Sequence, residues 1–427
     1  MEKKKKMVPK LRFKEFVDAG DWEQRKSVDI ADYSKGNGYS KSDLTENGTP
    51  IILYGRLYTK YQFAIAEVDT FATPKDGSIY SQGNEVIIPA SGETAEDIAR
   101  ASAVEKSGVL LGGDLNILRP FNFINPLFLA LTISNGEPQK ELAKKAQGKS
   151  VVHIHNSDIQ EVTVSFPTRA EQDRIVAVFR SLDNLITLHQ RKVDKLQQVK
   201  KAYLCEMFPE NGKTKPKRRF KGFTDDWEQR KFDEVFDCTI PNNTLSRAEL
   251  NYESGSVRNI HYGDILIKYG SVVDVQNDEI PFATGKSSDD FKGALLQDGD
   301  IIIADTAEDE TTGKVCEIGN SQGLDVVSGL HTMVCRPRNK MALGYLGYYL
   351  NSDAYHHQLL PLMQGIKVLS LSRTNVQKTM VCYPKSNAEQ QLIADCFRNL
   401  DKLITLHQRK VEKLKKLKES YLNDMFV

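Results

Sequence analysis

The sequence predicts an α+β protein made of two strand-rich domains, related by a pseudo-two-fold axis and joined by a pair of long antiparallel coiled-coil helices. Three observations lead to this fold class. The 427-residue chain contains an internal repeat with a period of a little over 200 residues. Each copy ends in a heptad pattern without Gly or Pro, and short strand-like runs fill the rest of the copy.

The repeat sets the expected domain boundaries. RFKEFVDAGDWEQRK at residues 12–26 returns as RFKGFTDDWEQRK at 219–231, and residues 170–208 return at 388–426 with 24 of 39 positions identical, including LITLHQRKV. We therefore expect one domain at 1–168, a conserved helix at 169–208, a linker at 209–218, a second domain at 219–386 and a second conserved helix at 387–427. Near-identical ends around dissimilar middles suggest two copies that do one job on two different targets.

The conserved segments are expected to pair through a helix-helix seam. Apolar side chains recur in steps of three and four, and each segment would span roughly 57 Å as a helix. The separate packing of each helix on its own domain is the alternative. Two histidines fall at matching seam positions, where a hydrogen-bonded residue at the edge of the core is favoured over a ligand or pH sensor. The predicted seam residues are Phe179, Leu182, Ile186, His189, Val193, Leu196, Phe397, Leu400, Ile404, His407, Val411 and Leu414.

The middles are expected to form strongly curved sheets, each with one amphipathic helix, from Asn125 and from Leu343. Several short motifs occur in both copies despite the divergence around them. Tyr54-Gly55 and Lys60-Tyr61 match Tyr262-Gly263 and Lys268-Tyr269, and Thr94-Ala95-Glu96-Asp97 matches Thr306-Ala307-Glu308-Asp309. Arg119-Pro120 matches Arg336-Pro337, and Gln147-Gly148 matches Gln364-Gly365.

Composition alone does not indicate a nucleic-acid binder. The net charge is +1, and residues 219–386 carry a net charge of −6. No apolar run approaches the ~20 residues that cross a bilayer, and the six cysteines form no C-x-x-C pair. We expect a cytoplasmic protein with reduced thiols, no membrane association and no metal site.

The sequence contains few candidates for catalysis. Gly285-Lys286-Ser287 lacks the upstream glycine of a phosphate loop. Asn125-Pro126-Leu127-Phe128 faintly resembles an adenine methyltransferase motif, but a helix start with Asn as cap and Pro in the first turn explains it better. The acidic run 307–310 is typical of a solvated loop rather than of a Mg²⁺ site. We therefore expect no catalytic site in this chain.

The motifs resemble the specificity-subunit family of Type I restriction-modification systems across essentially the whole chain. The resemblance rests on R-F-x-x-F followed by Trp22-Glu23 or Trp227-Glu228, on Gln-Gly-x-x-V, and on helix openings with Glu171-Gln172 and Glu389-Gln390. It implies two target-recognition domains that each read half of a bipartite double-stranded DNA target, and a helix pair that acts as a ruler between them.

The resemblance also implies partners. These are two modification (methyltransferase) subunits and restriction (motor-nuclease) subunits, which would carry the chemistry with S-adenosylmethionine, ATP and Mg, while this chain needs no cofactor. Two other classes stay open. In the first, the chain is an orphan or regulatory DNA-binding protein without a methyltransferase partner. In the second, it is a coiled-coil assembly adaptor whose domains bind proteins.

Residues kept in both copies are the expected DNA contacts. A lysine kept while its surroundings change suits phosphate binding, which needs positive charge whichever base is read. The alternatives are exposed lysines beside a structural tyrosine, and polar side chains that cap helices or form turns. The candidate DNA-binding residues are Lys60, Tyr61, Ser91, Thr94, Lys268, Tyr269, Asp305 and Thr306.

Overall fold

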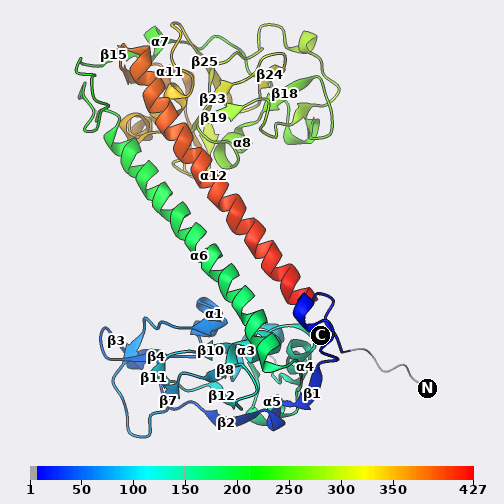
Figure 1. Cartoon of the computed structure of the whole chain (residues 1–427). Helices are drawn as coiled ribbons and strands as arrows, with labels where there is room; N and C mark the ends of the chain where they lie inside the picture. The colour runs from blue at the N-terminus through cyan, green and yellow to red at the C-terminus, as the bar shows by residue number, and fades with distance from the viewer. Residues whose placement is uncertain (1–6, 149–150, 211) are drawn as a thin grey trace. The chain divides into compact units, whose positions relative to one another are not determined.

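The computed structural model describes residues 7–148, 151–210 and 212–427, which form two compact units. Unit 1 comprises Met1–His189 and Arg409–Val427, and unit 2 comprises Gln190–Gln408. Each unit therefore contains one strand-rich domain together with a segment of each long helix, α6 (Arg169–Glu206) and α12 (Asn387–Asp424) (Figure 1). In the described part of the chain, no helix has the length and apolar character of a membrane span.

Unit 1 has two five-stranded sheets and two small ladders. The first sheet has the order β2 (Ala31–Lys35), β12 (Leu115–Pro120), β8 (Glu85–Pro89), β10 (Ser102–Val104), β5 (Ala64–Ile65). The second has the order β3 (Leu44–Thr45), β6 (Phe71–Ala72), β4 (Thr49–Ile52), β11 (Ser107–Leu111), β7 (Tyr80–Gln82). The ladders pair β1 (Glu23–Lys26) with β14 (Thr163–Phe166) and β9 (Ser91–Gly92) with β13 (Val152–His153).

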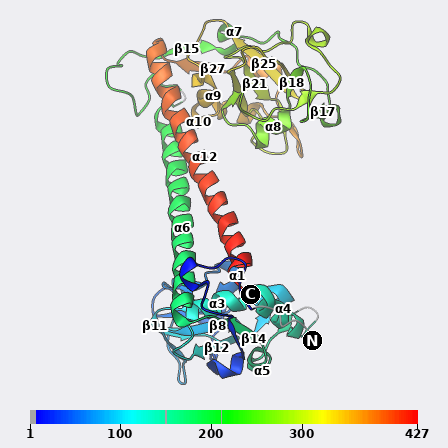
Figure 2. The ribbon, with the colours of Figure 1, turned by 45° about the vertical axis from the view of Figure 1, so that its right-hand side comes forward.

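Unit 2 repeats this order of strands. Its first sheet runs β16 (Phe236–Asp237), β25 (Thr332–Pro337), β21 (Ile301–Ala304), β23 (Val315–Gly319), β19 (Val272–Asp274). Its second sheet has four strands, β17 (Leu250–Asn251), β20 (Phe282–Ala283), β18 (Val257–Ile260), β24 (Asp325–Ser328). The ladders pair β15 (Glu228–Lys231) with β27 (Met380–Tyr383), seen in Figure 2, and β22 (Thr306–Ala307) with β26 (Leu369–Ser370).

The short helices differ from the sequence-based expectation in one respect. Residues Leu127–Ile133 of α3 (Pro126–Ile133) and all of α9 (Tyr345–Leu350) are buried, so neither helix is amphipathic. Each is apolar around its whole circumference because it is covered on every side. The Asn125 side chain accepts hydrogen bonds from the backbone N–H of Leu127 and Phe128, which confirms it as a helix cap.

The remaining helices are short and lie at the edges of the domains. In unit 1 they are α1 (Arg56–Thr59), α2 (Ala95–Ile98), α4 (Gly136–Lys145) and α5 (Asn156–Gln160). In unit 2 they are α7 (Phe232–Val235), α8 (Tyr262–Ile267), α10 (Asp353–His356) and α11 (Arg373–Val376).

The long helices run antiparallel within each unit. In unit 1, Lys418 Nζ lies 2.6 Å from Asp183 Oδ1, while the later residue Phe426 contacts the earlier residue Phe179. In unit 2, Lys200 and Asp401 make the matching ion pair at 2.5 Å, and Phe208 stacks on Phe397. The predicted fold class, with an antiparallel helix pair, is confirmed.

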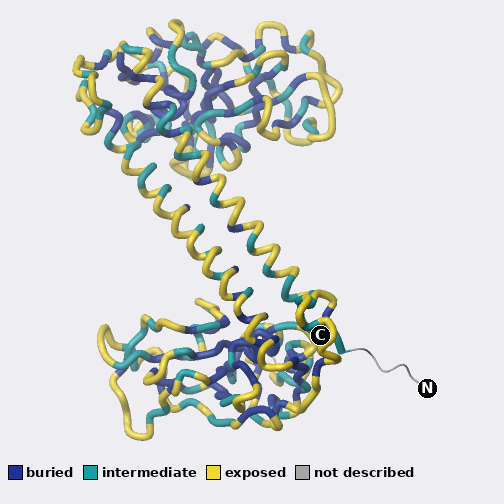
Figure 3. Tube along the Cα trace, in the orientation of Figure 1, coloured by how far each residue is buried: buried dark blue, intermediate teal, exposed yellow. Residues whose placement is uncertain are grey.

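Burial along both helices follows the heptad pattern (Figure 3). All twelve predicted seam residues are buried or half-buried, His189 and His407 being half-buried. Several other leucines on the long helices face solvent instead, and each has 38–48% of its surface exposed. They include Leu185, Leu188, Leu403, Leu406 and Leu417.

The first turn of each long helix is held by a buried ion pair to the segment that enters its domain. The Arg12 guanidinium donates to both carboxylate oxygens of Glu171 at 2.8 and 2.7 Å, and Arg219 does the same to Glu389 at 2.6 and 2.9 Å. Both glutamates are 1% exposed. These contacts explain the Arg of the entry motif and the Glu of the helix opening.

The glutamine side chain of each helix opening forms hydrogen bonds with backbone groups nearby. Gln172 Nε2 donates to the Pro167 carbonyl and its Oε1 accepts from Asn125 N–H, while Gln390 bonds Pro384 and Ala342 in the same way. The motif therefore fixes where each helix leaves its domain.

The phenylalanine that follows each long helix two residues after its end lies in an aromatic cluster. In unit 1, Phe426 packs against Trp22 and Phe128 at centroid distances of 6.4 and 5.6 Å. In unit 2, Phe208 packs against Trp227 and Tyr345 at 6.4 and 6.1 Å. Helix α6 thus starts in the core of unit 1 and ends in the core of unit 2, and α12 does the reverse.

Candidate nucleic-acid interface

A tight glycine turn next to a two-stranded ladder occurs at the same place in each unit. In unit 1, Gln147 and His153 exchange backbone hydrogen bonds, and in unit 2 Gln364 and Ser370 do so. Gly148 (φ +139) and Gly365 (φ +130) occupy the turns, and a Cβ on either would lie 1.9 Å from a backbone carbonyl. Only glycine fits, which explains the repeated Gln-Gly.

The ladders correct one match made from the sequence. Ser91 pairs with His153 on the ladder β9·β13, and Thr306 pairs with Ser370 on β22·β26, so Ser91 and Thr306 are structural equivalents. The two Thr-Ala-Glu-Asp motifs are therefore three residues out of register. Thr94 caps α2 by accepting from Asp97 N–H, whereas Thr306 begins a strand, so their identity does not reflect a shared role.

The two matched lysines lie at equivalent places, directly after α1 and α8, and each is paired with an acid. Lys60 Nζ lies 2.5 Å from Asp69, and Lys268 Nζ lies 2.8 Å from Glu279. The hydrogen bonds from Lys60 and Arg56 lower the pKa of Asp69. Exposed pairs of this kind contribute about 1 kcal/mol or less, so a phosphate can displace the carboxylate.

The tyrosines after these lysines act in the fold. Tyr61 donates from its hydroxyl to the Ala101 carbonyl, and burial of that hydroxyl raises its pKa, but 38% of the residue is exposed, so Tyr61 stays accessible. Tyr269 is 5% exposed, and burial likewise raises its pKa. Tyr269 is therefore not accessible to DNA in this structure, which contradicts its placement among the contacts. Its side chain packs in the core around Ile265 and Val273 instead.

The four polar candidates have different environments. Ser91 is 8% exposed and its Oγ lies 3.1 Å from His153 Nδ1, so its hydroxyl is already engaged and buried. Thr94 is exposed, and its hydroxyl serves the cap described above. Asp305 and Thr306 are half-buried and hydrogen-bonded to each other at 2.8 Å. Ser91, like Tyr269, is therefore not accessible to DNA in this structure.

The structure brings these segments together within each unit. In unit 1, the Tyr58 hydroxyl on α1 donates to the Ser91 carbonyl at 2.6 Å. In unit 2, Tyr262 at the start of α8 packs edge-on against His331, whose Nδ1 lies 3.7 Å from Asp305 Oδ1. In each unit, the helix that precedes the matched lysine therefore lies next to the segment that begins the polar ladder, and we call this neighbourhood the candidate surface.

One exposed position on this surface escaped the sequence reasoning. Asp114 in unit 1 and His331 in unit 2 have left-handed backbones, with φ of 57° and 54°, and both are exposed. Their carbonyls accept from Ala90 N–H and Asp305 N–H, the residues that directly precede Ser91 and Thr306. Among the described residues, the non-glycine residues with a positive φ are Asp114, Asn320 and His331, and Asp, Asn and His are the residue types that adopt this conformation most readily. The sequence signal was weak because only the turn, and not the residue, is shared.

Two further residues of unit 2 surround Lys268. Its ammonium lies 4.6 Å from the centroid of the exposed Tyr252 ring. Arg247 forms a two-point ion pair with the buried Asp264 and also reaches the Tyr252 hydroxyl at 3.4 Å. Lys268 and Arg247 therefore place two basic groups beside one exposed ring.

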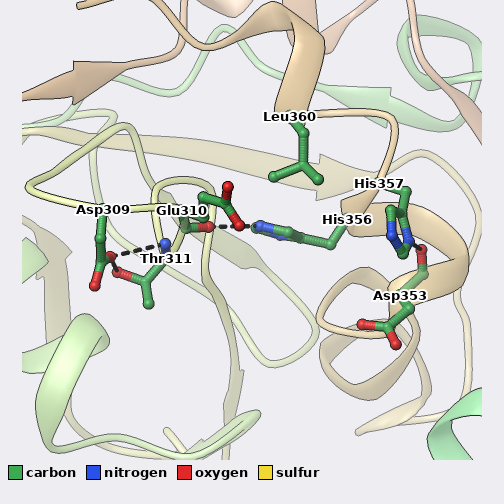
Figure 4. Close-up of a pocket in the computed structure, with 7 residues that line it drawn as sticks. All are labelled: Asp309, Glu310, Thr311, Asp353, His356, His357 and Leu360. Atoms are coloured by element: carbon green, nitrogen blue, oxygen red, sulfur yellow. Dashed lines mark hydrogen bonds between the residues drawn. The ribbon is translucent and has the colours of Figure 1, made fainter. Parts of the chain in front are cut away.

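A pocket of about 500 Å³ lies in unit 2, between residues 309–311 and the helix α10 with the residues that follow it (Figure 4). His356 Nε2 lies 2.8 Å from the Glu310 carbonyl, and Thr311 N–H donates to Asp309. The lining is acidic and so disfavours phosphate. Within residues 7–148, 151–210 and 212–427, no cluster of three or more His, Cys, Asp or Glu side chains is arranged to hold a metal ion.

Comparison with known proteins places these observations in a family. The family model described as "Type I restriction modification DNA specificity domain" matches residues 19–198 and 224–416. The chain belongs to this family. The two matches coincide with the two copies of the repeat, so each unit contains one DNA specificity domain.

Relatives of full length support this membership. The Type I restriction enzyme MjaVIII specificity subunit of Methanocaldococcus jannaschii is 22% identical over 414 residues, covering 94% of this chain and 91% of that protein. The crystal structure of a Type I restriction-modification S subunit from M. genitalium shares the fold, with a TM-score of 0.61, 14% identity and 99% coverage of both chains. A chain from a structure on complex assembly of the type I R-M system matches with a TM-score of 0.52 and 14% identity, covering 95% of this chain and 97% of its own.

Proposed function

We propose that this chain is the non-catalytic subunit that reads a bipartite double-stranded DNA target for a Type I restriction-modification complex. The observation that carries the proposal is the duplication of one specificity domain with different side chains at the same exposed turn. The Asp114 carboxylate offers only hydrogen-bond acceptors, whereas the His331 imidazole also offers a donor, so each unit suits a different set of base edges. Each unit would then read one half of the target.

The long helices suit a ruler between the half-sites. Each is a continuous 38-residue α-helix, anchored at its first turn by a buried ion pair and just beyond its last turn by an aromatic cluster. A continuous helix without Gly or Pro resists bending. Readers held by such helices require half-sites at one fixed spacing, as dimeric repressors do.

The helices also offer two equivalent docking surfaces. Leu185 and Leu188 on α6, and Leu403 and Leu406 on α12, are 43–48% exposed at the same positions of the LITLHQRKV repeat. Leucines three apart lie on one helix face and suit a partner helix. Two such surfaces fit two modification subunits, and the restriction subunits would join that assembly.

The chemistry is assigned to those partners. Methyl transfer from S-adenosylmethionine and ATP-driven, Mg-dependent cleavage would be carried by the modification and restriction subunits, and this chain would bind no cofactor. Its contribution is to place the partners on a chosen DNA sequence, which sets its work in the cytoplasm.

Methylome sequencing tests the DNA-reading role. A host that lacks Type I systems would express this chain with its modification subunits, and the expected result is adenine methylation in one bipartite motif. Exchanging residues 30–165 for those of a relative should change one half of the motif and leave the other half and the spacer unchanged. A simultaneous change in both halves would show that the units are not independent readers.

Paired substitutions test the docking surface. Leu188→Asp with Leu406→Asp should abolish co-purification of modification subunits and leave the thermal midpoint of the isolated chain unchanged, because these leucines face solvent. Ile186→Asp with Ile404→Asp, two residues earlier and on the seam side of each helix, should lower the stability by about 3 kcal/mol or more, because a charge is placed in the seam. Undiminished co-purification with the leucine variant would place the partner elsewhere.

A further inference from the structure

Two cysteines of unit 2 lie in direct contact inside the first sheet. Cys238 Sγ and Cys335 Sγ are 3.0 Å apart, although 97 positions separate them in the sequence. Both are free thiols and are 4% and 1% exposed. Cys335 lies in the middle of β25, and Cys238 is the first residue after β16.

The strand register gives this pair the geometry that a disulfide needs. β16 pairs antiparallel with β25, Asp237 opposite Arg336, so Cys238 falls opposite Cys335. Arg338 N–H donates to the Val235 carbonyl, which makes 235/338 a hydrogen-bonded pair. Because pair types alternate, 238/335 is a non-hydrogen-bonded pair, with Cα atoms about 4.5 Å apart. Disulfides accept Cα separations of about 4.4–6.8 Å.

The pair is specific to unit 2. The equivalent positions of unit 1 are Tyr33 and Leu118, which face each other on β2·β12. The shared fold therefore does not require cysteine at these positions. The other thiols differ in access: Cys205 is exposed, Cys396 is half-buried, and Cys316 and Cys382 are buried.

We propose that Cys238 and Cys335 form an oxidation site, at which a small oxidant such as hydrogen peroxide produces a disulfide that joins β16 to β25. The Cys238 thiolate attacks one peroxide oxygen, the O–O bond breaks, and protonation of the departing hydroxide gives water and a sulfenic acid on Cys238. The Cys335 sulfur then attacks the Cys238 sulfur, the S–O bond breaks, and a second water leaves. Two thiols and one peroxide thus give one disulfide and two waters.

The environment sets the order of the two steps. The hydrogen bond between the thiols lowers the pKa of Cys238, while burial raises that of Cys335. Cys238 is also the more exposed of the two and lies just beyond the end of β16, so it is assigned as the first thiol to react and Cys335 as the resolving thiol. Cys238 also begins the loop that leads to Asn243, whose side chain donates to the Ser328 carbonyl, so the disulfide would fix the start of that loop.

Peptide mapping of the full chain tests the proposal. A Cys205→Ser, Cys396→Ser background removes the two accessible thiols, and the folded protein is treated with peroxide, then alkylated and digested without reductant. The expected product is a peptide pair linked through Cys238 and Cys335 that is lighter than the two thiol peptides by two hydrogens, while Cys316 remains a thiol. Oxidation should raise the thermal midpoint of unit 2 by about 10 °C, and dithiothreitol should reverse the shift.

The Cys335→Ser variant is the control for this experiment. Cys335→Ser should give neither the linked peptide nor the reversible shift, and the comparison of oxidised with reduced unmodified chain does not depend on how that variant folds. Retention of both thiols, separate oxidation of each, or linkage only between molecules would overturn the proposal.

Discussion

Units 1 and 2 agree where side chains are buried against the long helices and differ where side chains meet solvent. The pairs Arg12–Glu171 and Arg219–Glu389 have the same two-point geometry, although the domains around them have diverged. The turns at Asp114 and His331 share a backbone conformation and carry different side chains, a carboxylate in unit 1 and an imidazole in unit 2. The comparison indicates that helix attachment was kept because both helices depend on it, while the side chain at the exposed turn was free to change.

The two units also differ in the side chain that accepts hydrogen bonds from the first backbone N–H groups of the central helix, α3 or α9. In unit 1, Asn125 caps α3 from within the same segment. In unit 2, Glu317 on β23 reaches across and accepts from Gly344 and Gly347 N–H at 2.8 Å, beneath α9. The position equivalent to Glu317 on β10 is Ala103. Only unit 2 therefore places a buried carboxyl under its central helix.

The largest expected effect comes from breaking the helix anchors. Removing one partner of a buried ion pair leaves an uncompensated charge, so Arg219→Ala should destabilise unit 2 by about 3–5 kcal/mol. Arg12→Ala should do the same to unit 1. The chain has two tryptophans, Trp22 in unit 1 and Trp227 in unit 2, so urea unfolding of Trp22→Phe and Trp227→Phe backgrounds reports each unit by fluorescence.

The exposed pair Lys213–Glu210 provides the control for the anchors. Lys213→Ala should change stability by less than about 0.5 kcal/mol, because both side chains are solvated. If Arg219→Ala lowers the stability of both units equally, the units unfold together and the comparison between them loses its basis.

A smaller effect is expected from pH, and only in unit 2. Burial raises the pKa of Glu317 to about 7, against an unfolded value near 4.5. A raised carboxyl pKa favours the protonated folded state, so the contribution is fully present below about pH 4.5 and is lost as pH rises through about 7. The loss amounts to about 3 kcal/mol. Urea midpoints read from Trp227 between pH 5 and 8 should fall, and those read from Trp22 should not follow.

Glu317→Gln separates this titration from the packing of α9. The neutral amide should lower stability at pH 5 and remove most of the slope between pH 5 and 8. A slope that persists in the variant would assign the titration to another group.

The exposed turn should affect recognition by about 1–3 kcal/mol, the range for a single base contact. His331→Asp should alter preference within the half-site read by unit 2, and Asp114→His should alter the other half-site. Binding to a library of randomised targets measures both. Changes spread evenly over both half-sites, or none in either variant, would remove this turn from base reading.

The sequence predicted more of the scaffold than of the surface. The repeated Glu-Gln, Gln-Gly and heptad residues are shared between the copies because buried contacts and a glycine-only turn leave no substitute, as at Gly148 and Gly365. Exposed residues follow no such constraint. The Thr94 motif therefore matched Thr306 by chance, and Asp114 and His331 were missed because their shared feature is a backbone angle that sequence identity does not record.

The two matched lysines are shared between the copies although they are not buried. Lys60 and Lys268 are kept at equivalent, partly exposed positions, yet Tyr61 and Tyr269 beside them are kept for structural reasons, so retention alone does not decide between contact and scaffold. Tyr269 is buried without help from the lysine, since Lys268 extends to Glu279 and the Tyr252 ring. The contact of Lys60 and Lys268 with phosphate therefore stays a prediction.

The smallest expected effect is therefore a change in salt dependence. Lys60→Ala and Lys268→Ala should each weaken binding to all sequences alike and reduce the slope of log K against log salt by about one, because each phosphate contact releases about one counterion. The carboxylates Asp69 and Glu279, freed of their partners, add repulsion of the same sign. Fluorescence anisotropy of specific and scrambled duplexes across a salt series measures both quantities. Lys140→Ala, an exposed pair with Glu137 on α4, is the control and should leave the slope unchanged. If both lysine variants keep the slope of the unmodified chain, the lysines face solvent beside structural tyrosines, and the shared part of the interface must be sought on the Tyr262–His331 side of the surface.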